Sequence, residues 1–361
     1  MNLHKNVAKY LADLRYALIS PPIPHVRAKD PSAIAYYLYA LDKVTAKEWH
    51  WLGYLFAKLP PNQNLWEFAL ICSHVAAHVP DLGVKFVDAL ADVCTGSYVE
   101  AQYEQMLQIF AEVFCIYRIL KMPWSKDANF QHEPKGANGK RPEFRVLAGG
   151  AYFIFEVKAP SLLEHQRRRA RAPTQIPARL HPDLTAALNA SGGGGALMPR
   201  DNPVKDFLVD ANNKFVGFES GGGVNILIIV WDDFIYEPLA SLIGETGLLT
   251  VNSFNRIENK AVQYRAVDMV VCMRHLSVFQ QGLAERELPD GRETMFDFGS
   301  NPRTPNVHVP TPWGKPVPEL ITNGLSSLNY NDEVLRDVAE YRTPELIIWL
   351  GGTTEIVSND P

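Results

Sequence analysis

The chain has 361 residues, of which 47% are apolar and 21% charged, the composition of an ordinary soluble globular protein with a large core. Its 35 basic and 40 acidic residues give a net charge of −5, which excludes a wholly basic nucleic-acid coat but leaves room for a local basic groove. Four scattered cysteines argue against a zinc ribbon or a redox pair, no apolar run reaches the roughly 18 residues of a membrane span, and we therefore expect a cytoplasmic protein.

The first 96 residues have the pattern of a helical region. Apolar residues recur at helical spacing over residues 1–20, 31–58, 64–80 and 82–95, and prolines separate these stretches. Because the region is also rich in aromatic residues, we expect a helical layer whose main role is packing.

A long helix is predicted over residues 97–121, where apolar residues make a broad stripe at helical spacing. Glu112 interrupts the strongly apolar second half of this helix, and periodicity alone leaves a solvent-facing and a functional carboxylate equally open. Residues 122–141 are rich in proline and glycine and are predicted to be irregular. This loop has a basic tip, made by Lys135, Lys140 and Arg141.

Two short strands joined by a tight turn are predicted over residues 141–158. Apolar side chains alternate with others on both sides of Gly149-Gly150, and a Gly-Gly pair is a hairpin signal. The second strand ends with Glu156 and Lys158, which are two positions apart and therefore leave the same face of the sheet. Glu143 lies across the turn and can reach the same edge of the hairpin. An acid and a lysine at the end of an apolar strand are costly to build, which indicates a function.

Basic residues follow the hairpin in an otherwise acidic chain. Residues 165–181 contain no acid, and a planar, always-charged guanidinium suits phosphate oxygens. A solvated loop or helix face explains the same run equally well. Residues 189–202 are predicted to form a flexible glycine-rich linker, and residues 203–216 a helix. The basic side chains of interest are Arg167, Arg168, Arg169, Arg171, Lys205 and Lys214.

The later part of the chain contains several further predicted elements. A near-continuous β-branched run over residues 224–231 predicts a central strand that is buried on both faces. Weaker patterns predict helices over 237–243 and 331–341, strands over 266–273 and 346–350, and a loop region over 285–318.

The order of a helix, a hairpin ending in Glu-x-Lys, a helix and a buried strand resembles the core of the PD-(D/E)xK nuclease superfamily, the restriction-endonuclease-like fold. Pro142-Glu143 matches the Pro-Asp element with Glu in place of Asp, and Glu156-Val157-Lys158 matches the (D/E)xK element. Glu112 lies on the preceding helix, where many members of the superfamily place an additional metal-binding Glu.

This resemblance covers roughly residues 97–232 and implies an α/β fold, with a mixed sheet flanked by helices and an added N-terminal helical layer. We divide the chain into a helical region at residues 1–96, a nuclease-like core at 97–235, and a C-terminal extension at 236–361. The extension is expected to pack on the core sheet or to extend it.

The resemblance also implies a metal-dependent nuclease that hydrolyses phosphodiester bonds of nucleic acid, with DNA as the expected substrate. Glu143 and Glu156 would hold Mg²⁺ (or Mn²⁺), and the carbonyl of Val157 would be a third ligand. Lys158 would orient or help deprotonate the attacking water and offset charge on the phosphate, while Glu112 would contact the metal or its water. The substrate backbone would be held by Arg167, Arg168, Arg169, Arg171, Lys205 and Lys214.

Other interpretations stay open. Glu156 and Lys158 can form a plain ion pair on a sheet, worth about 0.2–1 kcal/mol. The chain can also be a nuclease-fold module without catalytic activity that binds nucleic acid or a protein partner. Glu143 in place of Asp would position an ion differently, or would mark a site that has lost activity. A homodimer is compatible with the sequence.

Overall fold

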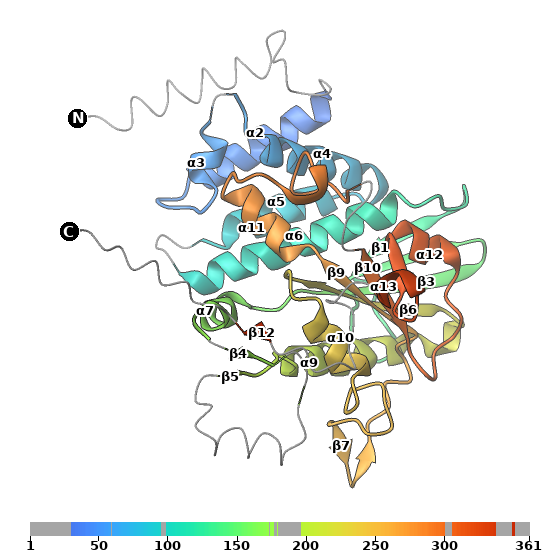
Figure 1. Ribbon diagram of the computed structural model, residues 1–361. Coiled ribbons are helices and arrows are strands. Elements are labelled where there is room, and N and C mark those ends of the chain that lie inside the picture. Colours follow the sequence, from blue (N-terminus) through green and yellow to red (C-terminus); the bar gives the residue numbers. More distant parts are fainter. Residues whose placement is uncertain are drawn as a thin grey trace, which may run out of the picture.

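The computed structural model describes residues 30–58, 60–94, 99–172, 174–176, 179, 196–299, 305–336 and 349–350. In this part of the chain, helices pack against a mixed seven-stranded sheet, so the protein belongs to the α/β class as expected. Figure 1 shows the N-terminal helices and the long helix α6 on one side of the sheet, and α9 and α10 on the other.

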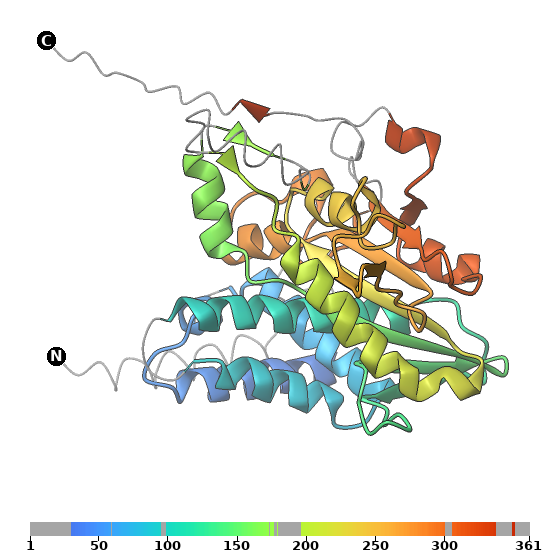
Figure 2. The ribbon, with the colours of Figure 1, turned by 90° about the horizontal axis from the view of Figure 1, so that it is seen from below.

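The N-terminal region is helical, which confirms the prediction from its apolar periodicity. Asp30 and Asn62 cap two of its helices, because their side chains accept hydrogen bonds from backbone N–H groups of the first turn. The helices pack on one another and on α6, and Figure 2 shows this stacking from below. The helices are α2 (Pro31–Thr45), α3 (Gly53–Phe56), α4 (Gln63–His78) and α5 (Leu82–Asp92).

The seven-stranded sheet has the order β1-β2-β3-β6-β9-β10-β11. The strands β3, β6 and β9 run parallel to one another, whereas β1, β2 and β3 form antiparallel pairs. The strand β6 lies at the centre and is buried along almost its whole length, as its apolar sequence predicts. The strands are β1 (Asn129–His132), β2 (Phe144–Ala148), β3 (Ala151–Lys158), β6 (Val224–Trp231), β9 (Met269–Arg274), β10 (Asn306–Pro310) and β11 (Ser327–Asn329).

The hairpin β2–β3 forms where the sequence predicts it. Gly149 and Gly150 adopt positive φ angles of 55° and 76°, which glycine tolerates and other residues rarely do. Phe144 pairs with Phe155 in the antiparallel register, so the start of β2 lies beside the end of β3. This register positions the candidate site, because Glu143 precedes β2 directly and Lys158 ends β3.

The helix α6 (Glu100–Leu120) packs its apolar stripe on the sheet and on the N-terminal helices. The hairpin is followed by α7 (Leu163–Arg171), and α9 (Asn202–Phe215) contacts β3 and β6. The remaining helices are α10 (Tyr236–Ile243), α11 (Leu276–Leu283), α12 (Glu319–Gly324), α13 (Glu333–Arg336) and the short 3-10 helices η1 (Val216–Gly221) and η2 (Pro289–Gly291). Two small sheets complete the fold, with strands β4 (Thr174–Gln175), β5 (Ala196–Leu197) and β12 (Trp349–Leu350) in one and β7 (Arg256–Ile257) and β8 (Lys260–Ala261) in the other.

The structure differs from the sequence-based expectation in a few places. The strand β1 lies within residues 122–141, and β10 lies within residues 285–318, two stretches that were predicted to be irregular. The predicted helix over 31–58 is divided into α2 and α3. The predicted helix over residues 1–20, the first half of the linker over 189–202, and residues 337–348 lie outside the described residues.

The C-terminal part of the chain extends the sheet, because β9 pairs with β6 and carries β10 and β11 beyond it. The division into regions at residues 96 and 235 stays a prediction. Among the described residues, no helix combines the length and the apolar character needed to cross a bilayer.

Candidate active site

The candidate residues from the hairpin meet where β2 begins and β3 ends. Glu156 is fully buried and accepts hydrogen bonds from three groups. These are the backbone N–H of Glu143 at 3.2 Å, the Lys158 ammonium at 2.8 Å and the Lys214 ammonium at 2.5 Å. A buried carboxylate is tolerated only when it is paired and hydrogen-bonded, so these contacts explain how Glu156 can sit at this position.

Lys158 joins the hairpin to α9. Its ammonium lies 2.8 Å from the Glu156 carboxylate and 2.8 Å from the Asp210 carboxylate. Burial by itself would lower the pKa of Lys158, but the two carboxylates outweigh burial and raise this pKa above its ordinary value. The pKa of Asp210 is lowered, because the contact with Lys158 and the charge of Lys214 outweigh its partial burial. The Lys158 side chain is therefore a cation at neutral pH.

Lys214 has a position that differs from the expected contact with the substrate backbone. It is half-buried on α9, and besides Glu156 its ammonium lies 3.6 Å from Asp210 and 3.8 Å from Glu143. Asp210 and Lys214 are four residues apart on a helix, a spacing that puts two side chains on the same face. Lys214 is thus part of the candidate site.

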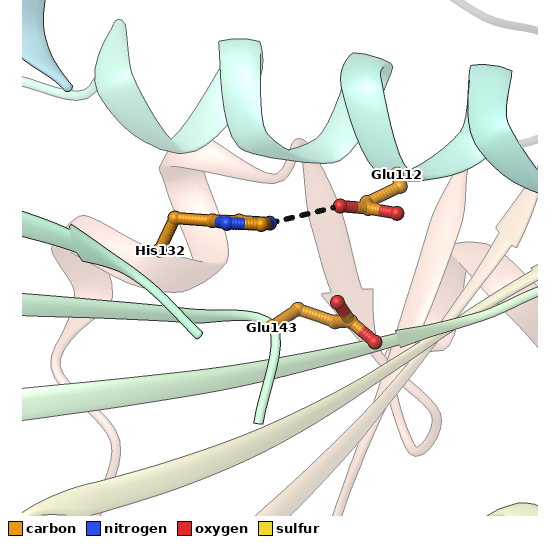
Figure 3. A group of neighbouring side chains, drawn as sticks. All are labelled: Glu112, His132 and Glu143. Carbon is orange, nitrogen blue, oxygen red and sulfur yellow. Dashed lines mark hydrogen bonds and ion pairs between the residues drawn. The ribbon is translucent and has the colours of Figure 1, made fainter. Parts of the chain in front are cut away.

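A second group of side chains faces the other side of Glu143. One ligand atom each from Glu112, His132 and Glu143 lies within 4.8 Å of the other two, and all three residues are half-buried (Figure 3). The imidazole of His132 contacts the Glu112 carboxylate at 3.2 Å. The helix α6 supplies Glu112, the end of β1 supplies His132, and the segment before β2 supplies Glu143. Carboxylates and imidazole are both metal ligands, so these three residues can hold a divalent cation.

Glu143 belongs both to the cluster around Glu156 and to the group with Glu112 and His132. Its burial, followed by the negative charges of Glu112 and Glu156, raises the pKa of Glu143 to about 8, although Lys214 and Lys158 partly offset this effect. A bound cation would stabilise the ionised form of this carboxylate.

The charges of the whole site point to the same conclusion. The site gathers four carboxylates and two lysines, namely Glu112, Glu143, Glu156, Asp210, Lys158 and Lys214. At neutral pH Glu143 is mostly protonated and one negative charge remains uncompensated; ionisation of Glu143 leaves two, which one divalent cation would match. Val157 lies in β3 opposite Ile228 of β6, and a role for its carbonyl as a ligand stays a prediction.

The arginines of α7 divide into two sets. The side chains of Arg167, Arg168 and Arg171 are exposed, and Arg167 pairs with Glu100 and Glu164. Arg169 is buried instead, and its guanidinium forms ion pairs of 2.9 Å with both Asp232 and Glu237.

Arg169 and Lys205 were both expected to hold the substrate backbone, and in the structure an acidic side chain lies beside each of them. The terminal nitrogens of Arg169 are occupied by buried acids, and a contact of Arg169 with the substrate backbone stays a prediction. Lys205 lies on α9, half-exposed, with Asp206 3.3 Å from its ammonium.

Two residues of the site were not anticipated from the sequence. His132 lies in a stretch that was expected to be irregular, and nothing in its neighbourhood marks it as a ligand. Asp210 could have been found, because it stands four residues before Lys214 on a predicted helix. Comparisons with protein-family models, with curated proteins and with solved structures give no match to this chain.

Proposed function

We propose that the protein is a metal-dependent nuclease with a restriction-endonuclease-like core, which hydrolyses phosphodiester bonds of nucleic acid and of DNA in particular. The elements that carry the resemblance follow in the expected order, as α6, the hairpin β2–β3, the helices α7 and α9, and the strand β6. The proposal concerns this core, to which the N-terminal helices and the C-terminal strands are added.

One observation carries the proposal: the residues that the sequence motif selects lie together in space. Glu112 comes from a helix, Glu143 from the segment before one strand, and Glu156 with Lys158 from the end of another. A surface ion pair between Glu156 and Lys158 would not require a third and a fourth acid nearby. The net charge of the cluster supports a site for a divalent cation.

A divalent cation would polarise the phosphate and make a water nucleophilic, which is the chemistry that phosphodiester hydrolysis requires. Glu143 and Glu112 would hold it, together with His132. Mg²⁺ prefers oxygen ligands, whereas imidazole suits transition metals better. The presence of His132 therefore favours Mn²⁺ over Mg²⁺ in this proposal.

Lys158 would act as a cation and not as a base. Its raised pKa keeps it protonated, so it can orient the attacking water and offset charge on the phosphate, but it cannot take up a proton. Lys214 would hold Glu156 in place by contacting the carboxylate from the side of α9. The exposed Arg168 and Arg171 would bind the backbone of the substrate, a contact that depends on charge and not on sequence.

A second candidate function is a nuclease-fold module without catalytic activity that binds nucleic acid. It is favoured by the contacts of Glu156, whose oxygens are already occupied by Lys158, Lys214 and a backbone N–H. In such a module the two lysines would permanently replace a cation. Binding of nucleic acid would then be independent of metal.

The proposal is tested by incubating the purified protein with plasmid and single-stranded DNA in the presence of Mn²⁺, Mg²⁺ or EDTA. Wild type should cut only with a metal, and Lys158→Ala and Glu156→Gln should each lose at least about 100-fold in rate, because each removes a charge from the site. Lys260→Ala on β8 and Glu287→Gln are matched controls, since both side chains are exposed and neither lies on an element that supplies a residue of the site.

The outcomes separate the two candidates. Cutting that persists in both site variants would refute this site. If the wild type binds DNA in EDTA and cuts nothing with either metal, the inactive module is the better account. Thermal melting of each variant shows whether a loss of activity follows from a loss of folding.

A further inference from the structure

A pocket of about 370 Å³ lies beside the carboxyl ends of β6 and β9. In open α/β sheets, ligands bind in the crevice outside the carboxyl ends of the parallel strands. Lys158 ends β3, the parallel neighbour of β6, so the pocket and the candidate active site lie along the same edge of the sheet. The lining includes Gln166, Arg169, Asp232, Phe234, Ser277 and Gln280.

Arg169, one of the lining residues, carries an unsatisfied buried donor. Its terminal nitrogens are paired with Asp232 and Glu237, and the ring of Phe234 covers the guanidinium with its centroid at 3.7 Å. The Nε–H group is buried and has no hydrogen-bond partner among the described residues. An unpaired buried donor costs free energy, and an acceptor atom of a ligand would remove that cost.

Two amide side chains provide exchangeable hydrogen bonds. Gln166 and Gln280 donate to each other over 3.2 and 3.4 Å, which is long for such bonds. Gln166 also donates to Asp232 at 3.1 Å. A ligand with a donor and an acceptor on one edge can replace the long amide–amide bonds without leaving either side chain unpaired.

The charges around the pocket favour a neutral ligand over an anion. Asp232 and Asp233 lie in its wall, and Glu237 lies behind Arg169. Arg169 and Arg274 neutralise only part of this charge, since Arg274 pairs with Asp233 at 3.0 Å. A phosphate group would therefore be repelled, whereas a neutral, planar molecule with amide-like edges and an aromatic face suits the walls.

We propose that this pocket receives one unpaired nucleobase of the nucleic acid. The base would exchange hydrogen bonds with Gln166 and Gln280, accept one from Arg169, and contact the half-buried ring of Phe234. The proposal rests on the proposed function, because it takes the nucleic acid as the source of the base. It adds that the protein prefers substrates in which a base is free to leave the stack, since unstacking a paired base costs a few kcal/mol.

The test measures the affinity of the full chain for two fluorescein-labelled DNA duplexes in EDTA, so that no cleavage occurs. Both duplexes carry the same single-nucleotide bulge, but in one of them the bulged nucleotide lacks its base. The shape and flexibility of the two probes are thus matched. Wild type should bind the probe with the base about tenfold more tightly, the range expected for one stacked base.

Gln280→Ala and Phe234→Ala should each reduce this preference severalfold, whereas Gln281→Ala should keep it. Gln281 is the matched control, because it neighbours Gln280 on α11 and does not line the pocket. Equal binding of the two probes by wild type, or an unchanged preference in both pocket variants, would overturn the proposal.

The proposed function is judged separately, by metal-dependent cleavage of plasmid DNA. A base preference that depends on the pocket, in a protein that cuts nothing, would uphold the pocket and reject the nuclease. Cleavage without a base preference would uphold the nuclease and reject the pocket.

Discussion

Glu143 is a half-buried carboxylate whose neighbours Glu112 and Glu156 are also acidic. Its pKa in the folded protein is about 8, well above the value of 4.5 for an ordinary glutamate. The uncharged form is therefore favoured by folding, and the associated stability is complete below pH 4.5 and is lost as the pH rises through 8. A difference of one pKa unit between the folded and unfolded states corresponds to about 1.4 kcal/mol. Ionisation of Glu143 in the folded protein therefore lowers the free energy of unfolding by a few kcal/mol at alkaline pH.

We expect Glu143→Gln to be more stable than wild type by about 2 kcal/mol or more at pH 8.5 in EDTA, and nearly equal to it in stability at pH 4, below the ordinary glutamate pKa of 4.5. The measurement is urea unfolding at both values of pH. Glu287→Gln serves as the control, since Glu287 is exposed, and it should not alter stability at either pH. If the cluster binds a cation, added Mn²⁺ should stabilise wild type at pH 8.5 and have a much smaller effect on Glu143→Gln.

His132 offers an independent test of the metal site. Removal of one of three ligands should lower affinity for Mn²⁺, and we expect His132→Ala to weaken binding by roughly 10–100-fold, the range known for the loss of groups that support a metal. Isothermal titration calorimetry with Mn²⁺ measures this directly, without any substrate. His308→Ala is the matched control, because His308 lies half-buried on β10 and belongs to another part of the sheet. Equal affinities of the two variants would remove His132 from the site.

At the scale of residues, the sequence predicted the members of the site that lie on one hairpin. The spacing of Glu143, Glu156 and Lys158 along an antiparallel pair fixes their proximity, because strand register follows from a tight turn. His132 was missed because it reaches the site from β1, and no pattern in its neighbourhood marks it as a ligand. Asp210 was missed although its spacing of four residues from Lys214 on a predicted helix was a usable signal.

At the scale of elements, α7 shows how a run of like charges can divide between surface and interior. Arg169 lies on the inner face and pairs with two buried acids, whereas Arg168 is exposed. We expect Arg169→Ala to lower the free energy of unfolding by about 3–5 kcal/mol, because Asp232 and Glu237 would remain buried without the positive charge of Arg169. Arg168→Ala should change stability by less than about 0.5 kcal/mol.

Urea unfolding of the two variants provides the comparison, and each variant is the control of the other because both lose one arginine from the same helix. Similar stabilities would mean that the ion pairs of Arg169 hold α7 in place only weakly. A double variant that also replaces Asp232 with Asn should recover part of the loss, since one of the two carboxylates that lose the contact with Arg169 is then uncharged.

Elements with a strong periodic pattern were predicted well, and short ones were not. The helix α6, the hairpin and the strand β6 each carry many apolar residues at the period of their structure. In contrast, β1 has four residues, half of them exposed, and takes its shape from pairing with β2. Such a strand is specified by its neighbour and not by its own sequence.

At the scale of the whole molecule, the sheet combines strands from the hairpin with strands far along the chain. The candidate site and the pocket lined by Gln166 and Gln280 both lie at its carboxyl edge, where β3 leads into α7 with its exposed arginines. A protein with a net charge of −5 repels nucleic acid as a whole. The binding of nucleic acid that we propose would therefore depend on a few local positive charges, such as the exposed Arg168 and Arg171 of α7.

The salt dependence of DNA binding tests this argument, because each phosphate contact releases counterions and contributes about 0.9 to the slope of log K against log salt. Replacement of Arg168 and Arg171 by Gln should reduce the slope by about 2, and should weaken binding to every DNA sequence alike. The control is the double variant Arg256→Gln with Arg265→Gln, which removes the same charge from residues that precede the amino end of β9. An equal reduction in both double variants would mean that the DNA responds to the total charge of the protein and not to α7. A reduction confined to the α7 variant would locate the backbone contact beside the carboxylate cluster, where the proposed nuclease needs its substrate.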